Sequence, residues 1–396
     1  MAKSGEATGL ALLFVIESAA AALWCLAVGA ALCDRRVSQK LSRDRDEEAE
    51  DVAQAVTAIV PARNEAGNIG DWIADVVAQT NRIVRIVVAD DSSEDDTARI
   101  AQDWAQRDGR VEVLRCPPPP AGWIGKSWAA HAAGLKADTK WLLFSDADMR
   151  MSPTTVAQAL DIARRFDAAA VSVTATLECE TAPERIVMPA MAALIFTAYP
   201  ICLIQDDRSE RALLWGGFIL VRRDAYLQVG GHASVRSEIA EDRALAQRLK
   251  AFGFRIRLIN GSECVRVRMY AGLLPMWEGW RKNVYEGVHR NPVGALLFMA
   301  TLCAMVVAPM PIALWIGLTA TRRRLSAMER KLVIVAAAGC AGALGVRLLR
   351  DPFIGADLRS VVATPLAGLF ISGVMAASAW RALSGAGQTW KGRTIH

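Results

Sequence analysis

The sequence predicts an α/β domain with a mostly parallel sheet, held between membrane segments at both ends of the chain. Short apolar runs alternate with amphipathic stretches from Ala55 to Phe166, a pattern typical of parallel strands joined by crossover helices. Hydrophobic residues make up 53% of the chain, and a mean hydropathy of +0.22 is apolar for a soluble protein. The remaining apolar residues gather near the two termini, which predicts the membrane segments.

The first membrane segment is expected at the N-terminus. Residues 8–33 carry one charge, Glu17, within 26 residues, which is long enough to span a bilayer. A basic flank follows and no clear cleavage site stands out, so residues 1–36 are interpreted as an uncleaved anchor. The flank places the following charged linker (residues 37–54) and the soluble domain in the cytoplasm, at the cell (inner) membrane. Glu17 is interpreted either as an intramembrane functional group or as a residue that reaches the outer surface, and we favour the second interpretation.

A C-terminal membrane domain is expected over residues 291–396. Its candidate spans are Val293 to Leu318, Leu332 to Leu348 and Val361 to Trp380. Three full spans would put the basic loop of residues 322–331 and the tail with Lys391 and Arg393 outside, against the positive-inside tendency. A re-entrant first segment, bent near Pro309 and Pro311, would keep both in the cytoplasm. We favour the re-entrant form slightly.

Charge and cysteine content exclude several classes of protein. The net charge of +5 comes from juxtamembrane basic residues, which suit an anionic lipid surface. No Lys/Arg stripe with interleaved aromatics occurs, so no nucleic-acid partner is expected. Eight cysteines without metal-ligand spacing and four scattered histidines predict reduced thiols and no Cys/His metal site.

The soluble domain, over residues 55–290, shows its elements in order. Strands are expected at Ala55–Val60, Ile83–Ala89, Val111–Leu114, Trp141–Phe144 and Phe254–Asn260, with helices at Asn68–Gln79, Asp96–Ala105 and Pro153–Phe166. Polar clusters follow three of these strands: Arg63 to Glu65, Asp90 to Ser93, and Asp146 to Asp148. Open α/β sheets bind ligands at the carboxyl ends of their strands, so these clusters predict the site.

The acids Asp146 and Asp148 are the sharpest chemical signal. In an extended backbone, residues i and i+2 point to the same side. Two such carboxylates repel each other in a dry site unless a divalent cation, Mg²⁺ or Mn²⁺, lies between their oxygens. Such an ion could hold a diphosphate and stabilise its departure. The alternative is a solvated turn, because Ser-Asp-Ala-Asp is also good turn chemistry.

Three motifs together resemble family 2 glycosyltransferases with a GT-A fold. They are Ile-Val-Pro-Ala-Arg-Asn-Glu from Ile59, Val-Ala-Asp-Asp-Ser-Ser-Glu-Asp-Asp-Thr from Val88, and Phe-Ser-Asp-Ala-Asp from Phe144. The resemblance implies a nucleotide-diphosphate sugar donor, with Asp91 on the base or ribose and Asp90 beside it. It maps the metal-binding Asp-x-Asp onto Asp146 and Asp148. Donor contacts are also expected from the first motif, at Pro61, Arg63 and Glu65.

The segment from Cys116 to Trp128 predicts a phosphate contact. Four prolines make it extended and stiff, and Gly122 and Gly125 allow a close approach of backbone to ligand. Lys126 supplies a positive charge for a diphosphate, although an exposed surface lysine is the alternative. The Gly-Trp-x-Gly-Lys context resembles the membrane subgroup that glycosylates hopanoids and carotenoids.

The acidic pair Glu241–Asp242 opens a predicted helix. The family places its catalytic base on the second acid of this pair, hence Asp242 with Glu241 beside it. The alternative is that the acids serve the helix dipole. Processive synthases of the family carry Gln-x-x-Arg-Trp nearby, whereas this chain has Met276 and Gly279 before Trp280. Arg281 and Lys282 follow, and they are expected either to contact the diphosphate from an interfacial helix, with Arg281 as the donor-binding residue, or to mark a lipid headgroup contact.

The stretch Ile186 to Ile204 has 19 residues without a charge. It is interpreted either as an interfacial segment that admits an apolar acceptor or as a buried core helix. Taken together, we expect a membrane-bound, metal-dependent, inverting glycosyltransferase that moves one sugar to a lipophilic acceptor, hopanoid- or carotenoid-like. The alternatives are a polysaccharide synthase of the same family and a catalytically inactive membrane scaffold.

Overall fold

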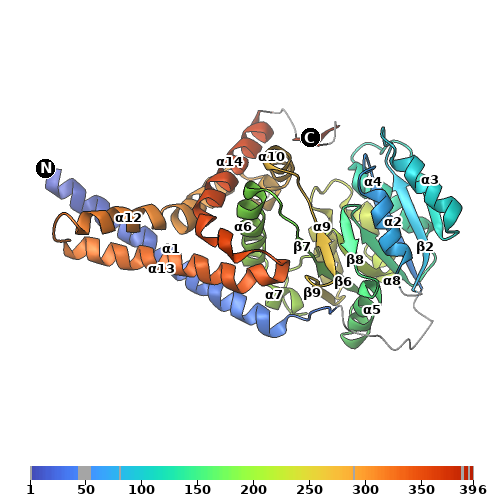
Figure 1. Cartoon of the computed structure of the whole chain (residues 1–396), viewed down its shortest axis with the longest axis horizontal. Coiled ribbons are helices and arrows are strands. Elements are labelled where there is room, and N and C mark those ends of the chain that lie inside the picture. Colours follow the sequence, from blue (N-terminus) through green and yellow to red (C-terminus); the bar gives the residue numbers. More distant parts are fainter. Residues whose placement is uncertain are drawn as a thin grey trace.

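The computed structural model describes residues 2–42, 55–79, 82–288, 290–384, 388–390 and 393–395. Most of the predicted charged linker, including Arg43 and Arg45, lies outside the described residues, as does Lys391. A sheet domain forms one end of the molecule, and long helices from both termini of the chain form the other (Figure 1).

The sheet domain is built on seven strands in the order β3-β2-β1-β4-β8-β6-β9. In chain order they are β1 (Val56–Ala62), β2 (Ile83–Asp90), β3 (Val111–Arg115), β4 (Trp141–Ser145), β6 (Ala170–Thr174), β8 (Phe218–Arg222) and β9 (Ile256–Asn260). Only β8 runs against its neighbours β4 and β6. The predicted mostly parallel α/β sheet is therefore confirmed, and the carboxyl ends of β1, β2 and β4 meet at one edge.

Helices cover the sheet as the sequence pattern requires. They are α2 (Ile69–Val77), α3 (Thr97–Arg107), α4 (Gly125–Lys136), α5 (Thr155–Arg165), α8 (Arg223–Gln228) and α9 (Glu241–Ala251). In α2 the buried side chains Ile69, Trp72, Ile73 and Val76 recur with the helical period, so one face packs on the sheet. A helix was not expected directly after the proline run, yet α4 begins at Gly125.

A small second sheet lies next to the end of β4. Its strands are β5 (Met149–Met151), β7 (Thr176–Leu177) and β10 (Val265–Val267), in the order β5-β10-β7. Strand β10 runs antiparallel to β5 and parallel to β7. Because β5 starts directly after Asp148, this sheet fixes the far side of the acidic turn.

Among the residues that the structure describes, three helices are long and apolar enough to cross a membrane: Thr8–Val37, Ala327–Ile354 and Leu358–Leu383. The first lies within α1 (Ala2–Val37), and the other two contain α13 (Ala327–Arg350) and α14 (Thr364–Leu383). Helix α1 packs along α13, and the Trp24 indole donates to the carbonyl of Met305 at 2.8 Å. Glu17 is 1% exposed in this packing, so the expectation that it reaches the outer surface is wrong.

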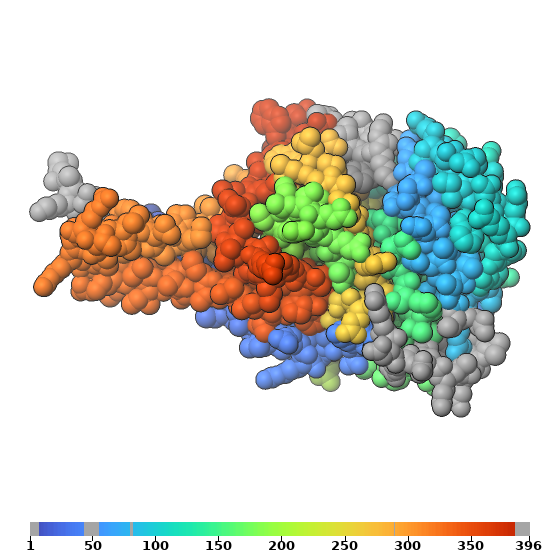
Figure 2. Space-filling model, in the orientation of Figure 1, coloured from blue at the N-terminus to red at the C-terminus, as the bar shows by residue number. Residues whose placement is uncertain are grey.

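The segment after Asn291 does not turn back at Pro309 and Pro311. Helix α11 (Pro292–Leu302) continues through the π-helical turn η3 (Cys303–Val307) into α12 (Pro309–Ala320). Helix α12 packs on α13, and this hairpin extends as a narrow arm away from the sheet domain, beside the start of α1 (Figures 1 and 2). The predicted bend near Pro309 and Pro311 is therefore wrong. A bend of 109° lies earlier, between Leu273–Val288 and Pro292–Val307.

The uncharged stretch forms α6 (Ala182–Ala198) and α7 (Ile201–Gln205). Helix α6 is mostly buried, packs on α14, and stands between the sheet and the membrane helices (Figure 1). The buried-helix interpretation is therefore favoured over a segment lying in the interface.

A buried carboxylate, Asp34, links two candidate membrane helices to each other and to the sheet domain. Asp34 at the end of α1 contacts Arg350 of α13 at 3.0 Å, and it accepts a hydrogen bond from the amide of Cys202 in α7 at 2.8 Å. Breaking such a pair from one side leaves an uncompensated buried charge. The sheet domain is thus fixed against α1 and α13.

Candidate active site

One large cavity runs from the edge of the sheet to the membrane helices. Its volume is about 1110 Å³. At the sheet end it is lined by Pro61, Arg63, Glu65 and Asp91, at its centre by Lys126, Asp146, Asp148, Glu241 and Asp242, and at its far end by Met191, Ile195, Phe298 and Met375. Residues from β1 to α14, far apart in the sequence, therefore share one space.

The two acids after β2 have different positions. Asp91 lines the cavity, and its carbonyl accepts from the Arg63 guanidinium at 3.2 Å. Asp90 does not line the cavity, because its carboxylate accepts from the amide of Ser93 at 3.2 Å and closes the turn. Asp91 can therefore make the predicted contact with a donor, whereas Asp90 stabilises the loop.

Asp146 and Asp148 both line the cavity, although not by the predicted extended backbone. A turn at Ala147 and Asp148 joins β4 to β5, and the amide of Asp146 donates to the carbonyl of Gly217 at 3.3 Å. Burial, followed by repulsion from the neighbouring Asp146 and Glu65, raises the pKa of Asp148 to about 7. The pair is a site of concentrated negative charge that a cation would relieve.

Lys126 lies in the first turn of α4 and points to the acids. Its ammonium is 2.8 Å from Asp146 Oδ1 and 2.8 Å from Glu241 Oε1. Burial alone would lower the pKa of Lys126, but the two carboxylates hold it well above its usual range. The preceding loop is held by Trp123, whose ring packs at 5.1 Å on that of Trp128. Lys126 is therefore not an unattached surface lysine.

Glu241 and Asp242 have opposite electrostatic environments. Burial and the nearby Glu241 raise the pKa of Asp242 to about 6. Burial opposes ionisation of Glu241 too, but the Lys126 ammonium lowers its pKa below the usual range. Asp242 Oδ2 accepts from the Gly216 amide at 3.0 Å, and a Cβ at Gly216 would lie 2.9 Å from that oxygen. Pairs with separated pKa values are typical of acid–base sites.

Comparison with known proteins fits this geometry. Residues 57–230 match the family profile described as glycosyl transferase family 2. These residues form a glycosyl transferase family 2 domain. The match and the mostly parallel sheet confirm the predicted GT-A-like fold.

The glycosyltransferase domain also has curated relatives. The chain is 26% identical over 250 residues to 4,4'-diaponeurosporenoate glycosyltransferase of Staphylococcus haemolyticus (strain JCSC1435), covering 62% of this chain and 65% of the relative. It is 25% identical over 244 residues to the Staphylococcus aureus (strain USA300) protein of that name, covering 59% and 62%. The matches thus span less than two thirds of those relatives.

Solved structures resemble the chain more distantly. A mannosyltransferase from Pyrobaculum calidifontis in complex with GDP-Man and Mn²⁺ is 17% identical, covers 93% of this chain and 99% of its own, and gives a TM-score of 0.47. Glucosyl-3-phosphoglycerate synthase from Mycobacterium tuberculosis is 15% identical, with 64% and 87% covered and a TM-score of 0.43.

Of the two cations expected after Trp280, Lys282 lines the cavity and Arg281 does not. The carbonyl of Arg281 accepts from the Ser378 hydroxyl at 2.6 Å. Burial lowers the pKa of Lys282, and Glu241 opposes that shift. In helix α10 (Leu273–Asn283) Met276 and Gly279 are buried, and Lys282 follows them at the helical spacing of three residues.

The absence of the Gln-x-x-Arg-Trp motif has a structural reason. A Cβ at Gly279, the position of the motif's arginine, would overlap the ring of Tyr270. Tyr270 lines the cavity and packs against Trp280, with ring centroids 6.1 Å apart. An arginine therefore cannot occupy this position while Tyr270 keeps its place.

The site fits a divalent cation that is bound together with the donor. In the parts of the chain that the structure describes, no three His, Cys, Asp or Glu side chains are grouped to hold a metal. Asp146 and Asp148 supply carboxylate oxygens, the ligands that Mg²⁺ and Mn²⁺ prefer. The remaining ligands would come from diphosphate oxygens and water, as is usual for Mg²⁺.

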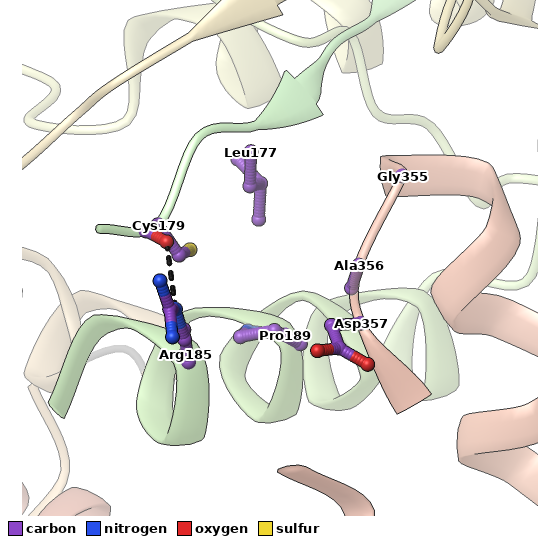
Figure 3. Close-up of a pocket in the computed structure, with 7 residues that line it drawn as sticks. All are labelled: Leu177, Cys179, Arg185, Pro189, Gly355, Ala356 and Asp357. Carbon is purple, nitrogen blue, oxygen red and sulfur yellow. Dashed lines mark hydrogen bonds between the residues drawn. The ribbon is translucent and has the colours of Figure 1, made fainter. Parts of the chain in front are cut away.

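A smaller cavity of about 210 Å³ lies between β7, α6 and the loop after α13 (Figure 3). Arg185 reaches from α6 to donate to the carbonyl of Cys179 at 3.1 Å, and Asp357 lies across from it. None of the predicted site residues lines this cavity, so it is separate from the larger cavity.

Proposed function

We propose that this protein is a membrane-bound inverting glycosyltransferase that moves one sugar from a nucleotide-diphosphate sugar to a lipophilic acceptor. The observation that carries the proposal is the single cavity, which joins Asp91, Asp146 and Asp148 to Phe298 and Met375 on the membrane helices. A donor and a membrane-dissolved acceptor could meet only in such a space.

The donor is bound at the sheet end. Asp91 and Arg63 contact the nucleoside, and Pro61 and Glu65 line the same wall. Lys126 and Lys282 approach the diphosphate, where positive charge stabilises a developing anion. Asp146 and Asp148 would hold a divalent cation, which neutralises the charge on the leaving diphosphate.

Asp242 acts on the acceptor. With a pKa of about 6, its carboxylate is ionised at neutral pH and basic enough to take a proton from an acceptor hydroxyl. The hydroxyl oxygen bonds to the anomeric carbon as the bond from that carbon to the diphosphate breaks, through an oxocarbenium-like state. One base without a covalent nucleophile gives inversion. Glu241 keeps Lys126 in position through their ion pair.

The acceptor is an apolar molecule with a polar end, hopanoid- or carotenoid-like. Helix α6 contributes Met191, Leu194 and Ile195 to the cavity, and the membrane helices contribute Phe298 and Met375. The names of the curated relatives, which are glycosyltransferases of a carotenoid acid, support this acceptor class.

The catalytic domain lies on the cytoplasmic side of the cell (inner) membrane, with several helices crossing it. Arg35 and Arg36, in the last turn of α1 next to the sheet domain, support this orientation. The loop with Arg322 to Arg324 then lies on the opposite side, at the end of the α12–α13 arm.

The test is turnover of a panel of uridine- and guanosine-diphosphate sugars by the purified full chain with Mg²⁺ or Mn²⁺. Mass spectrometry of lipids from producing cells runs in parallel. We expect one donor to be hydrolysed slowly without acceptor and a new glycolipid to appear in cells. Absence of turnover with every donor, or transfer to soluble sugars alone, would contradict the proposal.

A further inference from the structure

Helix α14 is long and apolar enough to cross a membrane, yet both of its ends lie against the sheet domain. Before it, the carbonyl of Phe353 accepts a hydrogen bond from the Thr174 hydroxyl at the end of β6, at 3.3 Å. After it, β11 (Gln388–Trp390) packs on α10, which follows β10 of the small sheet. A crossing helix has its ends on opposite faces of a bilayer core about 30 Å thick. The sheet domain would then have to reach both faces.

The middle of α14 also packs on elements of the sheet domain. The Ser378 hydroxyl donates to the Arg281 carbonyl of α10 at 2.6 Å. On the same side α14 packs on α6. Helix α6 follows β7 and leads into α7, where the Gln205 amide group donates to the Leu258 carbonyl of β9 at 2.8 Å. The chain thus enters and leaves α6 at the sheet domain, and α14 lies at the same depth as α6.

The direction of α14 differs from that of the arm. The arm of α12 and α13 extends away from the sheet domain beside α1, whereas α6 and α14 run across that direction (Figure 1). Spanning helices tilt by about 20° on average from the bilayer normal. When the bilayer is placed across the arm, as the proposed orientation requires, α14 therefore lies near the plane of the membrane.

The outward face of α14 is suited to lipid. Every exposed side chain between Thr364 and Leu383 is apolar. The exposed residues recur at helical spacing along one face: Leu366, Leu369, Ala376, Trp380 and Leu383. The apolar surface continues onto the exposed Leu296 and Leu297 of α11, which packs on α14. A continuous apolar surface of this kind marks a membrane contact.

We propose that α14 lies in the membrane interface, with its outward face against lipid, and does not cross the bilayer. The C-terminal tail then stays on the side of the sheet domain. In the sequence this tail carries Lys391 and Arg393, so the positive-inside tendency supports a cytoplasmic tail. The proposal rests on the membrane-bound part of the proposed function and holds for any donor or acceptor. Because Met375 on the inward face lines the large cavity, α14 is the wall between that cavity and the lipid.

The experiment measures how deep two positions of the outward face lie in the bilayer. A fluorescent amino acid replaces Leu369 or Leu383 in the full chain, in phosphatidylcholine vesicles that contain lipids with a doxyl quencher at graded depths. The interval between the two positions is about 21 Å along an α-helix. We expect the same doxyl position to quench both fluorophores most strongly. A crossing helix would place Leu369 near the bilayer centre and Leu383 at a surface, so different doxyl positions would quench them.

Ile334 and Leu348 of α13 are the matched control, because both are exposed and they are separated by the same interval on a helix of the arm. They should be quenched by different doxyl positions. Equal depths at these two positions would overturn the proposal, because the arm would then not cross the bilayer. Different depths at Leu369 and Leu383 would overturn it directly.

A reporter fused after His396 tests the side on which the tail lies. Green fluorescent protein should fluoresce there, and alkaline phosphatase, which is active only outside the cytoplasm, should be inactive. An active phosphatase fusion would overturn the proposal. Neither measurement requires a donor or an acceptor, so failure of the catalytic proposal would be seen separately, as absence of turnover with the donor panel.

Discussion

The two ends of the cavity are built in different ways. The charged end is made of loops at strand ends, with Asp91, Asp146 and Lys126 as its main groups. The apolar end is made of helix faces, with Ile195 from α6 and Met375 from α14. The charged end needs particular atoms at particular places, whereas the apolar end needs only shape and the exclusion of water. Substitutions should therefore act sharply at one end and gradually at the other.

The largest effect is expected from Asp242→Asn. An amide cannot take the proton of an acceptor hydroxyl, so transfer to an alcohol should fall by about 100- to 10,000-fold. Nucleoside-diphosphate affinity, measured by calorimetry, should stay near that of the wild type, because Asp242 is assigned to the acceptor. If the variant instead loses nucleotide binding and retains part of its transfer activity, Asp242 contacts the donor and is not the base.

Asp148→Ala tests the donor end separately. Removing one of the two carboxylates takes away an anchor of the divalent cation. We expect nucleoside-diphosphate binding to lose its dependence on Mn²⁺ in calorimetric titrations with and without the ion. The isosteric Asp148→Asn variant controls for packing. Unchanged affinities under both conditions would show that the acid has no part in metal binding.

Ile195→Lys tests the apolar end. A charge placed on the wall of the acceptor region should reduce lipid glycosylation several-fold, because an apolar chain would have to pass an ammonium group. Slow donor hydrolysis should persist, since Ile195 lies away from the acids, and Ile195→Leu should behave as wild type. Efficient transfer to a soluble sugar, unaffected by the lysine, would contradict the lipophilic acceptor.

A reversible effect on the same carboxylate is expected from pH. The pKa of Asp242 is raised to about 6, so its carboxylate binds a proton as pH falls through that value. The kcat/KM for alcohol acceptors should then fall about tenfold per pH unit below pH 6, and level off above it. Asp242→Asn should remove this limb of the profile. A flat profile between pH 5 and 7 would exclude Asp242 as the base.

The sequence predicted the sheet and the charged end well. Strands β1, β2 and β4 were visible as apolar runs, and their polar ends fixed Asp91 and the Asp146–Asp148 pair as neighbours. The polar residues directly after each strand were enough to predict this part of the site, because the carboxyl ends of parallel strands meet at one edge of the sheet. The sequence did not predict helix α4, which begins at Gly125. The proline run before it favours an extended backbone, but this preference ends before Gly122.

The apolar end could not be predicted in the same way. Whether α12 continues from α11 or turns back depends on its packing against α13, and prolines fit either form. Glu17 was expected at the surface, because its burial follows from the approach of α13 and not from its own neighbours in sequence. Arg281 and Lys282 are adjacent, and only the direction of α10 decides which one enters the cavity.

The most direct measurement asks whether one cavity holds both substrates. A photoactivatable apolar acceptor, with the reactive group at its apolar end, is added to the full chain in nanodiscs with nucleoside diphosphate and Mn²⁺. The labelled peptides are then identified by mass spectrometry. The account predicts labels on the segments that contain Phe298 and Met375, reduced by an unlabelled acceptor. Labels confined to the lipid-facing side of α1, or to the outer helices α2 and α3, would contradict it.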